Sequence, residues 1–150
     1  MAIGFTLIVP RFRSPGKAEP VIGIDTNILP RLFETDEHRR QTAMARRAVE
    51  EQGPVFISAI VLVEFAWTLR RAFKLDRTGI HSRLASIVDA PEFAVAFPRE
   101  TRRAIELFRA GPADFPDYLV GELNLSQGCD ATLTFDRDAA RNPAFRHLPV

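Results

Sequence analysis

Acidic side chains that directly follow predicted strands are the residues of this chain best placed to do chemistry. Asp25 follows the apolar run at residues 21–24, and Asp136 follows the run at residues 131–135. Ligands of open parallel α/β sheets bind beyond the carboxyl ends of the strands, which is where both carboxylates are expected. Each also has a purely structural explanation, because Asp25 suits a turn and Asp136 suits the cap of a helical turn at residues 138–141.

Glu64 is the only polar residue in the apolar run at residues 59–67. At helical spacing it shares a face with Val61, Phe65 and Thr68. The nearest basic residues lie six and seven positions further on, so no local cation offsets the cost of burying an ionised carboxylate there. A bound metal ion would offset that cost. The alternative is that Glu64 lies at the rim of the apolar face and reaches water.

Asp114 and Asp117 lie three residues apart at the start of another predicted helix, with Pro116 in its first turn. Proline is tolerated there, and the spacing puts both carboxylates on one face. They are suited to a metal site. They are equally suited to a capping box, since the helix dipole favours acids at both positions.

The acidic residues are more informative together than alone, because no cluster of histidine or cysteine accompanies them. Carboxylates at the ends of elements suit Mg²⁺ or Mn²⁺, which prefer oxygen ligands, and do not suit zinc. His38, His81 and His147 are scattered, and Cys129 stands alone. Zinc sites, cysteine nucleophiles and Ser-His-Asp triads therefore lack material, and no glycine-rich nucleotide loop is present.

Strand-like and helix-like segments alternate from residue 21 onward, and they must position these acids. The predicted strands cover residues 21–24, 55–57, 93–97, 131–135 and 145–150. The predicted helices begin near Thr35 and Ser58 and end near Gly53 and Phe73, and further helices cover residues 77–89, 99–110 and 114–128. Strands separated by helices predict right-handed crossovers and a three-layer α/β/α sandwich around a central, mainly parallel sheet.

The composition is that of one soluble globular domain. The chain has 150 residues, 46% of them hydrophobic and 26% charged, with a formal charge of +1. These values exclude a disordered tail, and no apolar run is long enough to span a membrane. A single cysteine favours a reducing, cytoplasmic location. Residues 1–20 lack periodicity and the marks of a signal peptide, so we expect an appendage followed by one domain at residues 21–150.

Arginine makes up 18 of the 20 basic residues. Its guanidinium group binds phosphate or carboxylate through two parallel hydrogen bonds, so the bias is compatible with a phosphate-bearing substrate or an acidic partner. Arg39 and Arg46, like Arg40 and Arg47, recur at seven-residue spacing along the predicted helix near residues 36–52. A solvated helix face explains the same stripe about as well.

Four segments together resemble PIN-domain ribonucleases, and most of all the VapC toxins of bacterial toxin–antitoxin pairs. The segments are VIGIDTN at 21–27, SAIVLVEF at 58–65, ADFPDYL at 113–119 and ATLTFDRD at 131–138. The resemblance implies that Asp25, Glu64 and Asp117 are core metal ligands and that Asp136 is the fourth catalytic acid. It further implies a supporting metal ligand, Asp114, and two residues that support the site beside the substrate, Asn27 and Thr134.

The function implied by this resemblance is hydrolysis of RNA phosphodiester bonds with Mg²⁺ or Mn²⁺, leaving a 5′-phosphate and a 3′-hydroxyl. Arg137 is the residue we expect to contact the phosphate. A homodimer and a cognate antitoxin protein are the implied partners. A PIN-like module that binds RNA or protein without cleavage is the main alternative. A phosphatase or receiver domain is disfavoured, because Asn27 replaces the second aspartate and no lysine follows Lys74.

Overall fold

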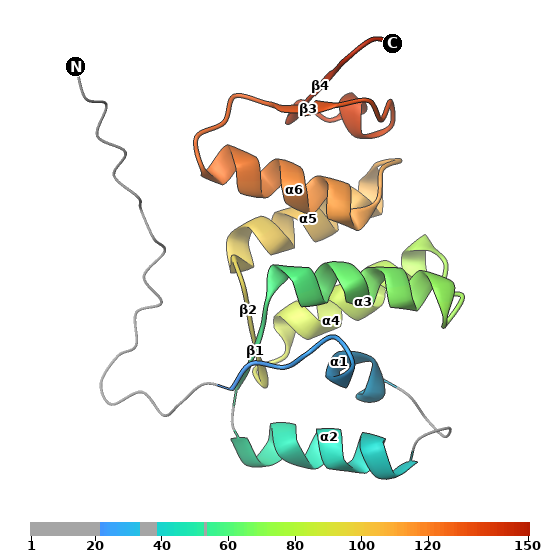
Figure 1. Cartoon of the computed structure of the whole chain (residues 1–150), viewed down its shortest axis with the longest axis vertical. Helices are drawn as coiled ribbons and strands as arrows, with labels where there is room; N and C mark the ends of the chain where they lie inside the picture. Colours follow the sequence, from blue (N-terminus) through green and yellow to red (C-terminus); the bar gives the residue numbers. More distant parts are fainter. Residues whose placement is uncertain (1–21, 34–38, 53) are drawn as a thin grey trace, which may run out of the picture.

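The structure is a computed structural model that describes residues 22–33, 39–52 and 54–150 (Figure 1). The expected appendage at residues 1–20 and the expected helix start at Thr35 lie outside these ranges. The helices are α1 (Ile28–Arg31), α2 (Arg39–Gln52), α3 (Ala59–Arg71), α4 (Arg77–Asp89), α5 (Pro98–Ala110), α6 (Phe115–Ser126) and the 3₁₀ turn η1 (Ala139–Arg141). The strands are β1 (Val55–Ile57), β2 (Phe93–Val95), β3 (Thr132–Thr134) and β4 (Phe145–His147).

All strand pairing within the described ranges is parallel, as the alternation of strands and helices predicts. β1 has a parallel neighbour along each edge, and its residues hydrogen-bond alternately to the one and to the other. Phe56 bonds to the segment at residues 22–24, with Phe56 N–H donating to Ile22 O at 2.8 Å. β2 pairs along the other edge, in the register Val55 to Phe93. The α/β class with parallel strands is therefore confirmed.

The strands form two parallel pairs, β1 with β2 and β3 with β4. Figure 1 shows β3 and β4 beyond α6, at the end of the molecule away from α2. In the second pair Thr132 lies opposite Phe145 and Thr134 lies opposite His147. Each of the acids Asp25 and Asp136 thus follows a strand segment, but the two segments belong to different pairs.

The hydrophobic core lies among α3, α4, α5 and α6. Its largest fully buried side chains include Phe65 and Leu69 of α3, Leu84 of α4, Phe108 of α5 and Phe115 of α6. The buried residues of each of these helices recur every three or four positions, which places them on one face of the helix. None of the helices in the described part of the chain combines the length and hydropathy needed to cross a membrane.

Side-chain caps set several helix boundaries. The Ser58 hydroxyl accepts a hydrogen bond from Val61 N–H at 3.4 Å, which confirms Ser58 as the cap of α3. Asp76 caps α4 in the same way through Gly79 N–H at 2.8 Å. The capping box of Asp114 and Asp117 at the start of α6 is present. The strand at residues 55–57 and the helix at residues 77–89 have the predicted bounds.

Four predicted strands are shorter in the structure. Within the described residues 22–24, the strand expected at 21–24 is present only as a bridge of Gly23 with Phe56, and β3 covers Thr132–Thr134 of the expected residues 131–135. The strand expected at residues 93–97 ends at Val95, because Phe97 adopts a left-handed conformation, with φ of 47°, as the N-cap of α5. The strand expected at residues 145–150 ends at His147. Leu148 N–H still donates to Thr134 O at 2.8 Å, so hydrogen bonding to β3 continues one residue beyond the strand.

Candidate functional site

The carboxylate of Asp136 caps the turn that follows β3. Its Oδ1 accepts hydrogen bonds from Asp138 N–H at 2.7 Å and from Ala139 N–H at 3.2 Å, which confirms the capping interpretation. The Thr134 hydroxyl accepts a bond from Asp136 N–H at 2.9 Å. These bonds fix the loop around Asp136. Within the described part of the chain, its other carboxylate oxygen, Oδ2, has no hydrogen-bond partner and remains available to a ligand.

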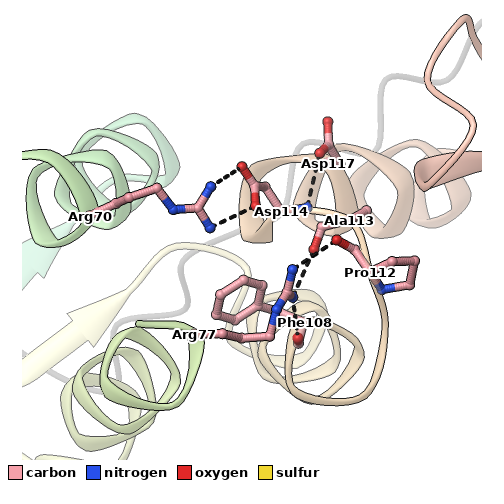
Figure 2. Close-up of polar contacts among 7 residues, drawn as sticks. All are labelled: Arg70, Arg77, Phe108, Pro112, Ala113, Asp114 and Asp117. Atoms are coloured by element: carbon pink, nitrogen blue, oxygen red, sulfur yellow. Dashed lines mark hydrogen bonds and ion pairs between the residues drawn. The ribbon is translucent and has the colours of Figure 1, made fainter. Parts of the chain in front are cut away.

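Asp114 and Asp117 lie at the start of α6 with different partners (Figure 2). Oδ2 of Asp117 accepts a hydrogen bond from Asp114 N–H at 3.2 Å. Both carboxylate oxygens of Asp114 bind the guanidinium group of Arg70, Oδ2 to Nη1 at 2.5 Å and Oδ1 to Nη2 at 2.7 Å. The hydrogen bond to Asp114 raises the pKa of Arg70. Asp114 is therefore neutralised by a cation, while Asp117 is not.

The electrostatic environment of Asp117 links it to Asp136. Burial raises the pKa of the Asp117 carboxyl, the hydrogen bond from Asp114 N–H opposes that rise, and the negative charges of Asp136 and Asp114 add to it. The negative charge of Asp136 therefore acts on Asp117, and we call these two electrostatically interacting carboxylates the acidic pair. A cation bound there would relieve both the burial cost and the repulsion.

Asp25 and Asn27 lie in the exposed turn before α1. Oδ1 of Asp25 accepts a hydrogen bond from Thr26 N–H at 2.7 Å, the local contact expected of an aspartate in a turn. Asn27 is the N-cap residue of α1, but its side chain makes no capping hydrogen bond. The geometry of both residues is thus that of a turn that leaves polar side chains exposed to solvent.

Glu64 is exposed on α3, so the expectation that it is buried in an apolar face is wrong, and it reaches water as the alternative predicted. At about 100° per residue, the buried arc of α3 is centred near Leu62 and Phe65, and Glu64 points well away from it. Ile60 and Trp67 share that outer side and are 70% and 45% exposed. The carboxylate therefore pays no burial cost and needs no compensating ion.

Comparison with known protein families decides the fold family. The PIN domain family matches residues 22–144, which is most of the chain. The chain belongs to the PIN-domain family. PIN domains have an α/β fold and are generally nucleases that bind RNA and use divalent metal ions, so the family supports a nuclease role. No curated protein matched the chain significantly.

The acidic residues of this PIN domain do not form a cage of protein ligands around one metal ion. Among residues 22–33, 39–52 and 54–150, no three His, Cys, Asp or Glu side chains gather closely enough to hold an ion. Mg²⁺, however, is commonly held by one or two carboxylates and completes its shell with waters. Asp117 and Asp136 fit that smaller requirement. Asp25 and Glu64 do not join them in a metal-holding group.

Two arginines that sequence reasoning did not single out position the acidic end of the PIN domain (Figure 2). Besides Arg70, Arg77 donates to one backbone carbonyl in the last turn of α5, Phe108 O at 2.7 Å, and to two in the α5–α6 connection, Pro112 O at 2.8 Å and Ala113 O at 2.9 Å. Its guanidinium carbon also lies 4.4 Å from the centroid of the Phe108 ring. Arg77 thereby holds the segment that presents Asp114 and Asp117, a role that no local sequence signal reveals.

Arg137, the expected phosphate contact, is exposed directly after Asp136. It lines an open cavity of about 390 Å³ together with Ala140, Arg141 and His147. The spacing of four residues between Arg137 and Arg141 was a signal available in the sequence. The position of His147 was not, because the pairing of β4 with β3 brings it there.

Proposed function

We propose that this PIN domain is an endoribonuclease that depends on Mg²⁺ or Mn²⁺ and acts as the VapC-type toxin of a toxin–antitoxin pair. The observation that carries the proposal is the acidic pair of Asp117 and Asp136, in a family whose members are generally nucleases. Asp117 is half-buried and lacks a basic partner within the described ranges, whereas Asp114 beside it is bound by Arg70. The uncompensated carboxylates suit a divalent cation.

The proposed reaction is hydrolysis of an RNA phosphodiester. Water adds to phosphorus, the bond to the 3′ oxygen breaks, and the proton lost by water ends on that oxygen, giving a 5′-phosphate and a 3′-hydroxyl. A divalent ion, when bound, lowers the pKa of water and stabilises charge on the leaving oxygen. Asp117 and Asp136 would hold it; the resemblance names Asp25 and Glu64 as further ligands, although the described residues form no group of three or more acids that could hold an ion. Asp114 would assist once Arg70 releases it.

The other residues have positioning roles in this proposal. Thr134 holds the backbone of Asp136 through its hydroxyl, and Arg137 next to it contacts the RNA phosphate. Asn27 supports the site from the exposed turn after Asp25. We propose a homodimer, a cytoplasmic location and an antitoxin as partner, since a nuclease that is toxic to its own cell requires restraint.

A cleavage assay tests the enzymatic part of the proposal. Wild-type protein is incubated with mixed RNA in Mg²⁺ or Mn²⁺, with and without a chelator, beside Asp117→Asn and Asp136→Asn. The exposed acid Asp130 provides the matched control, Asp130→Asn. We expect cleavage by wild type and the control only, abolished by chelator, with 5′-phosphate ends. Cleavage that survives the chelator or both site variants contradicts the proposal.

The biological part needs a separate experiment. Induction of the wild-type gene is expected to arrest growth and to create new RNA 5′ ends, and induction of the Asp117→Asn variant is expected to do neither. RNA binding without cleavage or arrest would favour the alternative, a PIN-like module that binds RNA or protein. Cleavage in vitro without arrest would remove the toxin assignment and leave the nuclease.

A further inference from the structure

The open depression lined by Arg137, Ala140, Arg141 and His147, called the cavity below, has the chemistry of an anion site. Its volume is about 390 Å³, and its open shape suits a charged group of an extended ligand and not an enclosed small molecule. Three of its four lining residues carry basic side chains, and none is acidic. Both arginines are exposed, so the cavity opens directly to solvent.

Two separate elements build this cavity, which makes it a property of the fold. The turn η1, which ends at Arg141, brings the side chains of Arg137 and Arg141 to one opening beside the small Ala140. The parallel pairing of β4 with β3 then adds His147, which lies opposite Thr134. The next hydrogen bond of the ladder, from Leu148 N–H to Thr134 O at 2.8 Å, holds that end of β4 in place.

The cations of the cavity are poorly compensated within the described part of the chain. Nε of Arg141 lies 3.9 Å from Asp138 Oδ1, and both side chains are more than half exposed, so this ion pair is weak. Arg137 makes no ion pair there. Two guanidinium groups at one opening favour an anion with several oxygens, because each group binds such an anion through parallel hydrogen bonds.

The position of the cavity identifies the anion. Arg137 follows Asp136 directly, and His147 lies opposite Thr134, whose hydroxyl fixes the backbone of Asp136. The cavity therefore adjoins the loop that carries Asp136, and an RNA strand bound at that loop would offer its phosphates to the cavity. We propose that the Arg137–Arg141–His147 cavity binds a phosphate of single-stranded RNA next to the one that is cleaved. This inference rests on the proposed function and assigns its substrate-binding subsite.

The test measures binding and not cleavage. A fluorescently labelled single-stranded RNA of about twelve nucleotides is titrated with full-length protein in chelator, and its anisotropy is followed at several salt concentrations. The variants are Arg137→Ala, Arg141→Ala, their double variant and His147→Gln. Arg146→Ala is the matched control. Arg146 is an exposed cation next to His147 in β4, and because side chains alternate along a strand, it points to the face opposite His147.

We expect the double variant to bind RNA about tenfold more weakly, as the loss of charge-assisted hydrogen bonds requires. The slope of log affinity against log salt is expected to fall by about 0.7, the value for one lost phosphate contact on a single strand. Arg146→Ala is expected to change neither quantity. The double variant Arg137→Lys with Arg141→Lys keeps both positive charges but loses the two parallel hydrogen bonds of each guanidinium group. We expect it to bind RNA with an affinity between those of wild type and the double alanine variant.

Three results would overturn the proposal. Wild-type affinity and slope in the double variant would exclude the cavity while leaving the nuclease intact, provided that wild type still cleaves RNA. An equal loss in Arg146→Ala would show diffuse attraction to the basic surface and no defined subsite. A wild type that neither binds nor cleaves RNA would remove the proposed function as well. Circular dichroism melting of each variant verifies that the fold is kept.

Discussion

Arg70 and Asp114 lie 44 residues apart in the chain and form a two-point ion pair, with contacts of 2.5 and 2.7 Å between guanidinium nitrogens and carboxylate oxygens. The pair joins the last turn of α3 to the first turn of α6. It also distinguishes two neighbouring acids, because Asp114 is neutralised and Asp117 is left to interact with Asp136. The first prediction concerns the strength of this pair.

A double-mutant cycle of Arg70→Ala and Asp114→Asn is expected to give a coupling free energy of about 1 kcal/mol, at the upper end for partly exposed pairs, because the geometry is bidentate. Urea unfolding measures it, and 1 M salt is expected to reduce it. The exposed pair of Arg47 and Glu51 on α2 is the control and is expected to give less than half as much. Equal coupling free energies in the two pairs would show that the two-point contact of Arg70 with Asp114 adds no stability.

Asp117 is expected to make the protein less stable as pH rises. Its folded-state pKa is raised above the ordinary value of 3.8, so the folded state binds its proton more tightly than the unfolded state. The free energy of unfolding therefore falls as pH rises from the unfolded value through the raised folded value. Asp117→Asn is expected to lack that part of the pH dependence. Arg70, whose pKa is raised by its hydrogen bond to Asp114, stays charged throughout.

Urea unfolding between pH 3 and 7 in chelator measures this difference, with Asp130→Asn as an exposed control. The difference in stability between Asp117→Asn and wild type is expected to grow with pH, and that between Asp130→Asn and wild type is expected to stay flat. Parallel profiles for wild type and Asp117→Asn would show that the carboxyl is not perturbed.

Arg77→Ala is expected to lower the free energy of unfolding by about 3 kcal/mol, since it removes a charged donor from three carbonyls at the end of α5 and in the α5–α6 connection. Thermal melting is expected to shift by about 10 °C for a chain of this size. Lysine is expected to restore little, because it lacks the planar fork. The exposed Arg103 on α5 supplies the control, and Arg103→Ala is expected to stay within about 0.5 kcal/mol of wild type.

Gly121→Ala tests the contact between α6 and β4. A Cβ atom at position 121 would lie 2.7 Å from Cε2 of Phe145 and 3.3 Å from Cβ of Ala144. Overpacking is expected to outweigh the gain in helix propensity and to cost about 1–2 kcal/mol in total. Phe145→Leu in the same chain is expected to recover part of that loss in urea unfolding. An additive double variant would show that the ring is not the obstacle.

Asp25→Asn and Glu64→Gln separate chemistry from structure. Both carboxylates are exposed, so neither change is expected to move the melting temperature by more than about 2 °C. If the family ligand set holds, each variant loses cleavage on the order of a hundredfold or more while RNA binding in chelator is unchanged. Full cleavage by both variants would confine the site to Asp117 and Asp136.

Local signals in the sequence predict much of the fold. Ser58 caps α3 and Asp114 caps α6 as predicted, because capping depends on residues within one turn. The face of α3 that carries Glu64 was not predictable in this way. Apolar residues occupy both sides of that helix, and Ile60 and Trp67 on the outer side remain exposed, so periodicity alone overstated the buried arc.

The acidic site was predictable only in part. The capping interpretation of Asp136 and the pairing of Asp114 with Asp117 follow from short-range spacing, and both are present. The interaction of Arg70 with Asp114 depends on how α3 packs against α6, and no pattern within either helix encodes it. Arg77 likewise acts on carbonyls more than thirty residues away, which only tertiary packing can supply.

The division of the strands into two pairs has a consequence for motion. Asp25 follows the segment bonded to β1, and Asp136 follows β3, so no shared ladder sets the separation of the two carboxylates. Helix packing sets it instead, and packed helices shift collectively over microseconds to milliseconds, far more slowly than a side chain rotates. We therefore expect a reaction that needs both carboxylates to depend on how the helices between the two strand pairs pack.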